Sequence, residues 1–118
     1  MIMSQKINID SLLENLTSKT QNGSCHWEEI SSSCYRLLLK SGSMKFSAIY
    51  IFEYDCYDFK LELYDMKECF YTIHGCELQE KKDNYNEALD SLYKAIVEWK
   101  NSELNSKITS LEKEILDM

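Results

Sequence analysis

Two histidines and five cysteines are the residues of this 118-residue chain that could form a zinc site. Cys25 and His26 are adjacent, His74 and Cys76 are separated by one residue, and Cys69 precedes that second pair. Zinc sites usually draw their ligands from pairs spaced about two to five residues apart. Adjacent residues of a strand point to opposite faces, so Cys25 and His26 would converge poorly on one ion. The spacing therefore predicts no metal site, and nothing else in the chain implies a cofactor.

Catalysis by a cysteine–histidine pair would need an activated cysteine, a histidine within reach and an oxyanion site. No motif in the chain fixes any of these. A divalent ion or a hydrolytic site could use Asp55, Asp58, Glu62 and Asp65 if they gathered at one sheet edge. A solvated turn and the polar face of a strand explain these carboxylates more simply. We predict no catalytic residue and a protein that is not an enzyme, with a small metal-dependent enzyme as the least favoured alternative.

The segment 9–20 has the pattern of a short amphipathic helix. Its apolar stripe consists of Ile9, Leu12, Leu13 and Leu16. Asn8 or Asp10 can cap the start of this helix, and Asn22-Gly23 can end it. We expect Trp27 to anchor the chain against this helix where the first strand begins. The neighbouring cysteine and histidine are then loop or strand residues without a chemical role.

Residues 26–76 have the pattern of an antiparallel meander of three to five strands. The strand candidates are 26–31, 34–40, 44–54, 59–65 and 69–75. The longest, 44–54, is partly apolar on both faces, which predicts a central strand. In 59–65 apolar and polar residues alternate, as they do when one face of a sheet is covered.

Residues 84–118 form a second helical region. Asn84 with Glu87 three residues later resembles a capping box. The apolar stripe has a first part, Tyr85, Leu89, Leu92, Ile96 and Trp99, and a second part, Leu104, Ile108, Leu111, Ile115 and Met118. The step of five between Trp99 and Leu104 predicts a stutter, bend or break near Asn101-Ser102. The second part either packs on the sheet, folds back as a helical hairpin, or pairs with a second copy.

These elements together predict an α+β fold with an N-terminal helix, a three- to five-stranded antiparallel meander and a long or broken C-terminal helix. The length fits one domain, 1–118, and 44% hydrophobic residues exclude a disordered composition. No apolar run approaches the roughly 20 residues of a membrane helix, and the start of the chain lacks the apolar core of a signal peptide. We therefore expect a cytoplasmic protein with reduced cysteines and no contact with a membrane.

Charge and tyrosine content predict how the protein binds. The formal net charge is −7, and the acid excess lies in residues 41–118. Direct binding to nucleic acid needs clustered Lys and Arg, which the chain lacks. An acidic surface suits a basic protein partner, and tyrosine is favoured at interfaces. The predicted partner-binding residues are Glu53, Tyr54, Asp55, Tyr57, Asp58, Glu62, Tyr64 and Asp65. The predicted self-association residues, in a homodimer, are Leu104, Ile108, Leu111 and Ile115.

The stretch "LLENLTSKTQNGSCHWEE" at 12–29 resembles the start of many small proteins from low-GC bacteria and their phages. These share a leucine-rich helix, a threonine near a Gly or Asn turn and then a tryptophan, followed by strands and a closing helix. Gly23 and Trp27 are the clearest points of the match, whereas the five cysteines and the long C-terminal region depart from it. The resemblance implies a fold type and transfers no catalytic residue. In size and acidity the chain is also similar to anti-CRISPR and other anti-defence proteins as a class, which is analogy alone.

The leading functional hypothesis is a small, acidic, non-enzymatic inhibitor of phage origin that blocks a basic surface of a host nuclease complex involved in antiviral defence. This hypothesis is based on the net charge of −7, the tyrosine content and the lack of a catalytic motif. The alternative is a structural or regulatory protein, such as an oligomeric accessory subunit or an immunity-type partner. Its motivation is the apolar seam in the C-terminal helical region.

Overall fold

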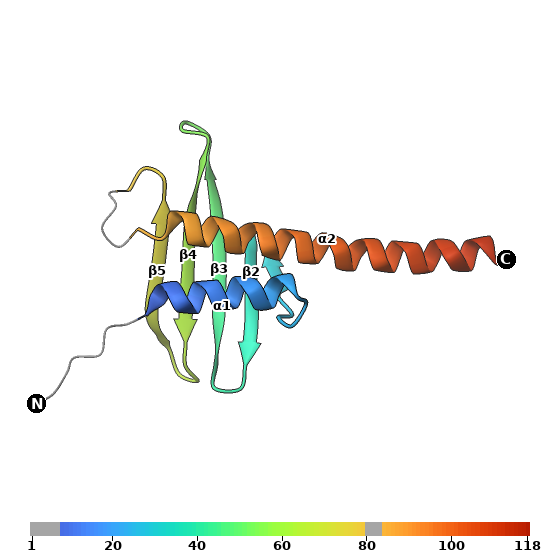
Figure 1. Cartoon of the computed structure of the whole chain (residues 1–118), viewed down its shortest axis with the longest axis horizontal. Coiled ribbons are helices and arrows are strands. Elements are labelled where there is room, and N and C mark those ends of the chain that lie inside the picture. Colours follow the sequence, from blue (N-terminus) through green and yellow to red (C-terminus); the bar gives the residue numbers. More distant parts are fainter. Residues whose placement is uncertain (1–7, 80–83) are drawn as a thin grey trace, which may run out of the picture.

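The computed structural model describes residues 8–79 and 84–118. Within these residues the chain forms helix α1 (Ile9–Gln21), strands β1 (Glu28–Ser31), β2 (Cys34–Leu39), β3 (Gly42–Ile51), β4 (Cys56–Tyr64) and β5 (Cys69–Cys76), and helix α2 (Asn86–Leu116). The predicted α+β order of helix, antiparallel sheet and long C-terminal helix is confirmed (Figure 1). Neither helix in the described ranges has the apolar length that a membrane crossing requires.

The five strands form one antiparallel meander in the order β1-β2-β3-β4-β5. This is the upper end of the predicted range of three to five strands. The strand predicted over 44–54 is central, as expected, but it begins at Gly42 and ends at Ile51. Residues 52–55 form the turn to β4 instead, so Phe52 and Tyr54 lie outside the ladder.

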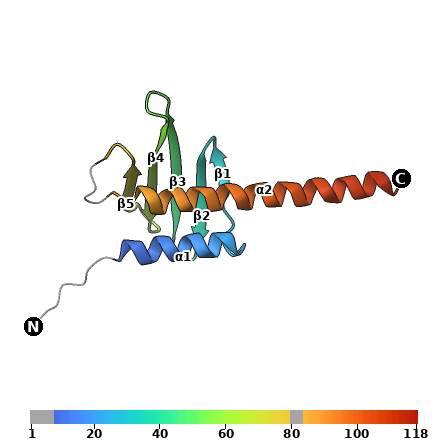
Figure 2. The same cartoon turned by 45° about the horizontal axis from the view of Figure 1, so that its top comes forward.

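Both helices lie across the same face of the sheet (Figures 1 and 2). Alternate residues of β2, β3 and β4 point towards them, and Phe46, Phe59 and Leu61, together with Ile73 of β5, are almost completely buried there. From α2 the core receives Leu89, Leu92 and Ile96, and from α1 it receives Leu13 and Leu16. The predicted amphipathic stripe of the first helix thus supplies part of the cover that a small sheet needs.

The start of α1 follows the sequence prediction, whereas the start of α2 does not. Asn8 caps α1, because its side-chain oxygen accepts a hydrogen bond from the Ser11 N–H at 3.0 Å. The capping box predicted at Asn84 is wrong. The Asn84 amide binds the backbone N–H and C=O of Cys76 at 2.9 and 2.8 Å, and α2 begins two residues later. Two backbone groups at the end of β5 would otherwise lose their partner, which favours this use of the side chain.

Of the stutter, bend or break predicted near Asn101-Ser102, the break is wrong, because α2 continues through these residues as one helix from Asn86 to Leu116. No glycine or proline stands in this part of the chain to interrupt the helix. A step of five instead of four moves an apolar stripe by one residue, about 100° around the helix axis. The irregular spacing therefore changes the direction of the stripe instead of breaking the helix, and the predicted alternative of a helical hairpin is excluded.

Candidate functional site

Trp27 is a structural anchor, as the sequence predicted. Its side chain is 2% exposed, and the indole N–H donates to the Thr20 hydroxyl of α1 at 3.0 Å. That hydroxyl donates in turn to the Leu16 carbonyl at 2.8 Å. The short network satisfies the polar atoms of both buried side chains. Trp27 therefore holds the end of α1 against the beginning of the sheet.

The histidines and cysteines are spread over several parts of the molecule. His26 is exposed and makes an edge-to-face contact with Trp99, with the ring centroids 5.7 Å apart. His74 is exposed on β5, beside Lys60 of β4. Cys56 is buried near Cys76, and burial is the main cause that raises the pKa of its thiol. In the described part of the chain, no three His, Cys, Asp or Glu side chains are grouped so that they could hold a metal ion.

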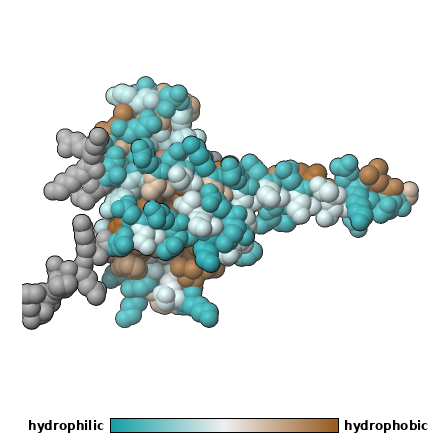
Figure 3. Space-filling model, in the orientation of Figure 1, coloured by the Kyte–Doolittle hydropathy of each residue, from teal (hydrophilic) through white to brown (hydrophobic). Residues whose placement is uncertain are grey.

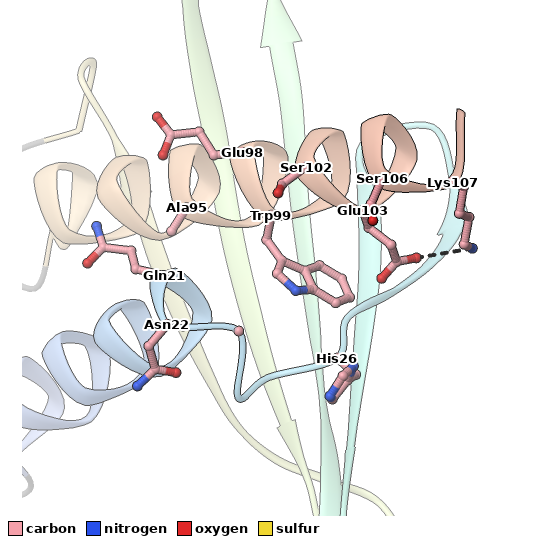
Figure 4. Close-up of a pocket in the computed structure, with 11 residues that line it drawn as sticks. Gln21, Asn22, His26, Ala95, Glu98, Trp99, Ser102, Glu103, Ser106 and Lys107 are labelled. Atoms are coloured by element: carbon pink, nitrogen blue, oxygen red, sulfur yellow. Dashed lines mark hydrogen bonds and ion pairs between the residues drawn. The ribbon is translucent and has the colours of Figure 1, made fainter. Parts of the chain in front are cut away.

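A surface hollow of about 650 Å³ lies between the end of α1 and the middle of α2 (Figure 4). Trp99 lines it, and Lys107 donates to Glu103 at 3.4 Å at one end. Glu98 points away from the indole in Figure 4, so the acidic side chains do not converge on one point. The hollow thus has an aromatic wall and polar edges, without a nucleophile and a base held together.

The structure separates the predicted partner-binding residues into two groups. Glu53, Tyr54 and Asp55 form the β3–β4 turn, and Tyr57 and Asp58 follow at the start of β4. The remaining three, Glu62, Tyr64 and Asp65, lie at or beyond the other end of β4. Ten residues of extended strand between positions 55 and 65 span about 33 Å. The eight residues therefore lie towards the two ends of β4 instead of in one compact cluster.

The carboxylates of the second group, Glu62 and Asp65, form contacts within the protein itself. The Glu62 carboxylate accepts a hydrogen bond from the Tyr64 hydroxyl at 3.3 Å and lies 3.9 Å from the Lys60 ammonium. The Asp65 carboxylate accepts hydrogen bonds from the backbone N–H groups of Lys67 and Glu68, each at 2.8 Å. These bonds hold the pKa of Asp65 below its usual value. Asp65 thus stabilises the β4–β5 turn.

The first group, together with Phe52, forms a protruding hairpin tip, which we define as residues 52–58 (Figure 1). Phe52 is 87% exposed and Tyr54 is 59% exposed, so two large aromatic side chains face solvent next to Glu53 and Asp55. Asp55 has a φ of +49°, a conformation that aspartate tolerates better than most residues. The Tyr50 hydroxyl donates to the Asp55 carboxylate across the turn, and this bond raises the pKa of Tyr50.

A continuous row of aromatic contacts connects the hairpin tip to the core. Starting from the tip, the successive ring pairs are Phe52–Tyr50 at 4.9 Å, Tyr50–Tyr57 at 5.3 Å, Tyr57–Tyr93 at 5.2 Å and Tyr93–Phe46 at 6.0 Å. These centroid distances lie within the range of favourable aromatic pairs. The row includes Tyr93 of α2, so the tip is braced from the helix layer as well as from its own strands.

The carboxylates of this region have no cationic partner in the structure. Glu53, Asp55 and Asp58 are all exposed, and none forms an ion pair with another described residue. Phe52 also belongs to this site, although the sequence pattern placed it in the strand over 44–54.

No family model matches the chain, and no curated protein and no solved structure was found to match it.

Proposed function

We propose that this protein is a non-enzymatic binding protein whose hairpin tip docks on a basic surface of another protein. One observation carries the proposal: Phe52 and Tyr54 are 87% and 59% exposed on a turn whose carboxylates form no ion pair with another described residue. Large exposed aromatic side chains cost solvation free energy unless a partner covers them, and such groups are common at binding sites.

The tip has the physical properties of a preformed anchor. The aromatic row and the Tyr50–Asp55 hydrogen bond restrict the turn before any partner arrives. A restricted turn loses less conformational entropy on binding, which favours affinity. Glu53, Asp55 and Asp58 would steer a basic partner towards the tip and exclude acidic ones. The aromatic rings would then supply most of the buried contact area.

A nucleic-acid-processing complex is the partner class that best fits this chemistry, because its binding channel is lined with basic residues. The protein would then act as an inhibitor by occupying the channel, as an anti-CRISPR-like anti-defence protein of a phage would, and it would do so in the cytoplasm. The net charge of −7 supports this choice over direct binding to nucleic acid. An enzymatic role forms no part of the proposal.

The second candidate function is that of a structural or regulatory accessory protein, including an immunity-type partner. The exposed apolar stripe of α2 favours it, because Leu104, Ile108, Leu111 and Ile115 are 51–66% exposed. A toxin gene beside the coding sequence would favour this second function, whereas a phage operon would favour the inhibitor.

The proposal is tested by affinity capture from the native host with paired variants of the tip. Glu53→Lys with Asp58→Lys reverses two charges, and Phe52→Ser with Tyr54→Ser removes the exposed rings without changing the charge. We expect both double variants to lose a nuclease complex that the wild-type protein retains and inhibits.

The matched control is Glu14→Lys with Glu98→Lys, which changes the net charge by the same amount at two exposed helix positions. This control should capture the same complex as the wild-type protein. Equal capture by the tip variants and the control would reject the hairpin tip as the interface. Capture without any loss of nuclease activity would reject inhibition while leaving binding in place.

A further inference from the structure

The distal half of α2 is a helix that nothing in the described structure covers. The last fully buried residue of α2 is Ile96, and from Leu104 to Leu116 every residue is exposed. We call residues 104–116 the α2 arm; it projects well beyond the sheet (Figures 1 and 2). A single helix of this length is only marginally stable in water without tertiary contacts. A partner that covers the apolar stripe would therefore stabilise this part of the helix.

The residue types along this stripe are specific for one kind of partner. Its spacing of four and three assigns Ile108 and Ile115 to heptad position a, and Leu104 and Leu111 to position d. In parallel coiled coils, isoleucine at a with leucine at d favours two strands over three or four. One heptad before Ile108, Asn101 takes position a, where asparagine specifies register and a two-stranded state.

The charged positions beside the stripe agree with the same arrangement. Lys107 occupies position g and Glu112 occupies position e of the following heptad. In a parallel pair of identical helices, Lys107 of each chain faces Glu112 of the other, which gives two opposite-charge contacts. In an antiparallel pair, Lys107 would instead face Glu114. We propose that the α2 arm forms a parallel two-stranded coiled coil with a second copy of this chain.

The direction of the stripe leaves space for the second helix. The stripe is rotated about 100° from the part of α2 that packs on the sheet, because one extra residue separates the two parts. In Figure 3 hydrophobic residues lie along the upper edge of the arm, whereas α1 lies below α2 in the same orientation. A second copy can therefore approach the arm on the side opposite α1. This inference is independent of the partner proposed for the hairpin tip.

The oligomeric state of the full chain in solution is the first test. Sedimentation equilibrium should give twice the monomer mass of 13.9 kDa at high protein concentration, with dissociation in the micromolar range, because the seam is short. Leu111→Lys should raise the dissociation constant by roughly a hundredfold or more, since it places a charge in the seam. Ser110→Lys, at an outward position of the same helix, is the matched control and should change it by less than about threefold.

A charge exchange tests the orientation. Lys107→Glu should weaken the dimer by roughly tenfold, and adding Glu112→Lys should restore it, because the opposite charges face each other again. Adding Glu114→Lys instead should not restore it. Circular dichroism checks that the arm stays helical in each variant, since Lys107 also binds Glu103 within its own helix.

Three results would overturn the inference. A mass of one chain at every concentration up to several hundred micromolar would exclude the dimer, and an intact dimer of the Leu111→Lys protein would place the seam elsewhere. Rescue of Lys107→Glu by Glu114→Lys, but not by Glu112→Lys, would show an antiparallel arrangement.

Discussion

Trp27 joins three elements of the fold at the scale of one residue. Its indole N–H binds Thr20 of α1, its carbonyl accepts a hydrogen bond from the Lys100 ammonium of α2 at 3.4 Å, and β1 begins at the next residue. The aromatic body could be predicted to be buried from the sequence. The partner of the indole N–H could not be predicted, because the spacing of Thr20 and Trp27 gives no indication that their side chains are in contact.

Replacement of Thr20 by valine should destabilise the protein by about 1–3 kcal/mol, because the buried indole N–H loses its only acceptor in the described structure. In a Trp27→Phe background the same replacement should cost less, since no N–H remains to be satisfied. Urea unfolding of the four proteins measures this coupling. Equal cost of Thr20→Val in both backgrounds would show that the hydrogen bond contributes nothing to stability.

Asp65 should make the stability of the protein depend on pH. Its folded pKa is lowered by two backbone hydrogen bonds, so its contribution is present above the unfolded value of about 3.9. That contribution is lost as the pH falls through the lower folded pKa. Asp65→Ala should therefore lower the melting temperature at pH 7 and have a vanishing effect at the acid end of the titration.

Asp65→Asn is the control for this prediction, because an amide oxygen can still accept the two hydrogen bonds. It should recover part of the loss at pH 7. A deficit of the Asp65→Ala protein that is the same at pH 7 and in acid would contradict a role for the charged carboxylate.

At the scale of elements, Gly75 sets how closely α2 approaches the sheet. A Cβ atom at this position would lie 2.6 Å from the backbone nitrogen of Asn86, and backbone cannot move aside as a side chain can. Gly75→Ala should therefore destabilise the protein by about 1–3 kcal/mol. Gly23, with a φ of +83° and open space around it, gives the comparison.

Gly23→Asn should cost less than Gly75→Ala, because asparagine tolerates a positive φ and meets no neighbour at that site. Thermal unfolding of both variants gives the order. A Gly75→Ala protein at least as stable as the Gly23→Asn protein would mean that α2 can shift away from β5 at little cost.

The elements that follow from local patterns were predictable, and those decided by long-range contacts were not. The alternation of apolar and polar residues predicted strands, and the apolar stripe at 9–20 predicted α1. The cap at Asn84 failed because β5 competes for the same amide. The stutter, bend and break near Asn101 could not be told apart, because an apolar stripe that shifts around a continuous helix and one that is interrupted by a break show the same irregular spacing in the sequence.

At the scale of the whole molecule, the arrangement of the strands decides which predicted site residues can act together. Acidic and tyrosine residues over 53–65 are close in sequence, but β4 carries them from one end of the sheet to the other. Phe52 joins the site only because the strand ends one residue before it. Sequence analysis could therefore predict an acidic, tyrosine-rich surface but not its location at a hairpin tip.

A parallel dimer would have a consequence for binding. It would place both sheets at the same end of the coiled coil, so that two hairpin tips would belong to one particle. Two tips on a repetitive partner surface would bind with higher apparent affinity than one. The tip and the arm would then have separate roles, one in recognition and the other in valency.

The dissociation constant between the captured partner and this protein, measured at low and high salt, tests the hairpin-tip proposal most directly. The wild-type interaction should weaken by roughly tenfold or more from 50 to 300 mM salt, because exposed charges are screened. Glu53→Lys with Asp58→Lys should bind weakly at both concentrations and show little further loss. A double variant that binds as tightly as the wild-type protein at both salt concentrations would contradict the proposed interface.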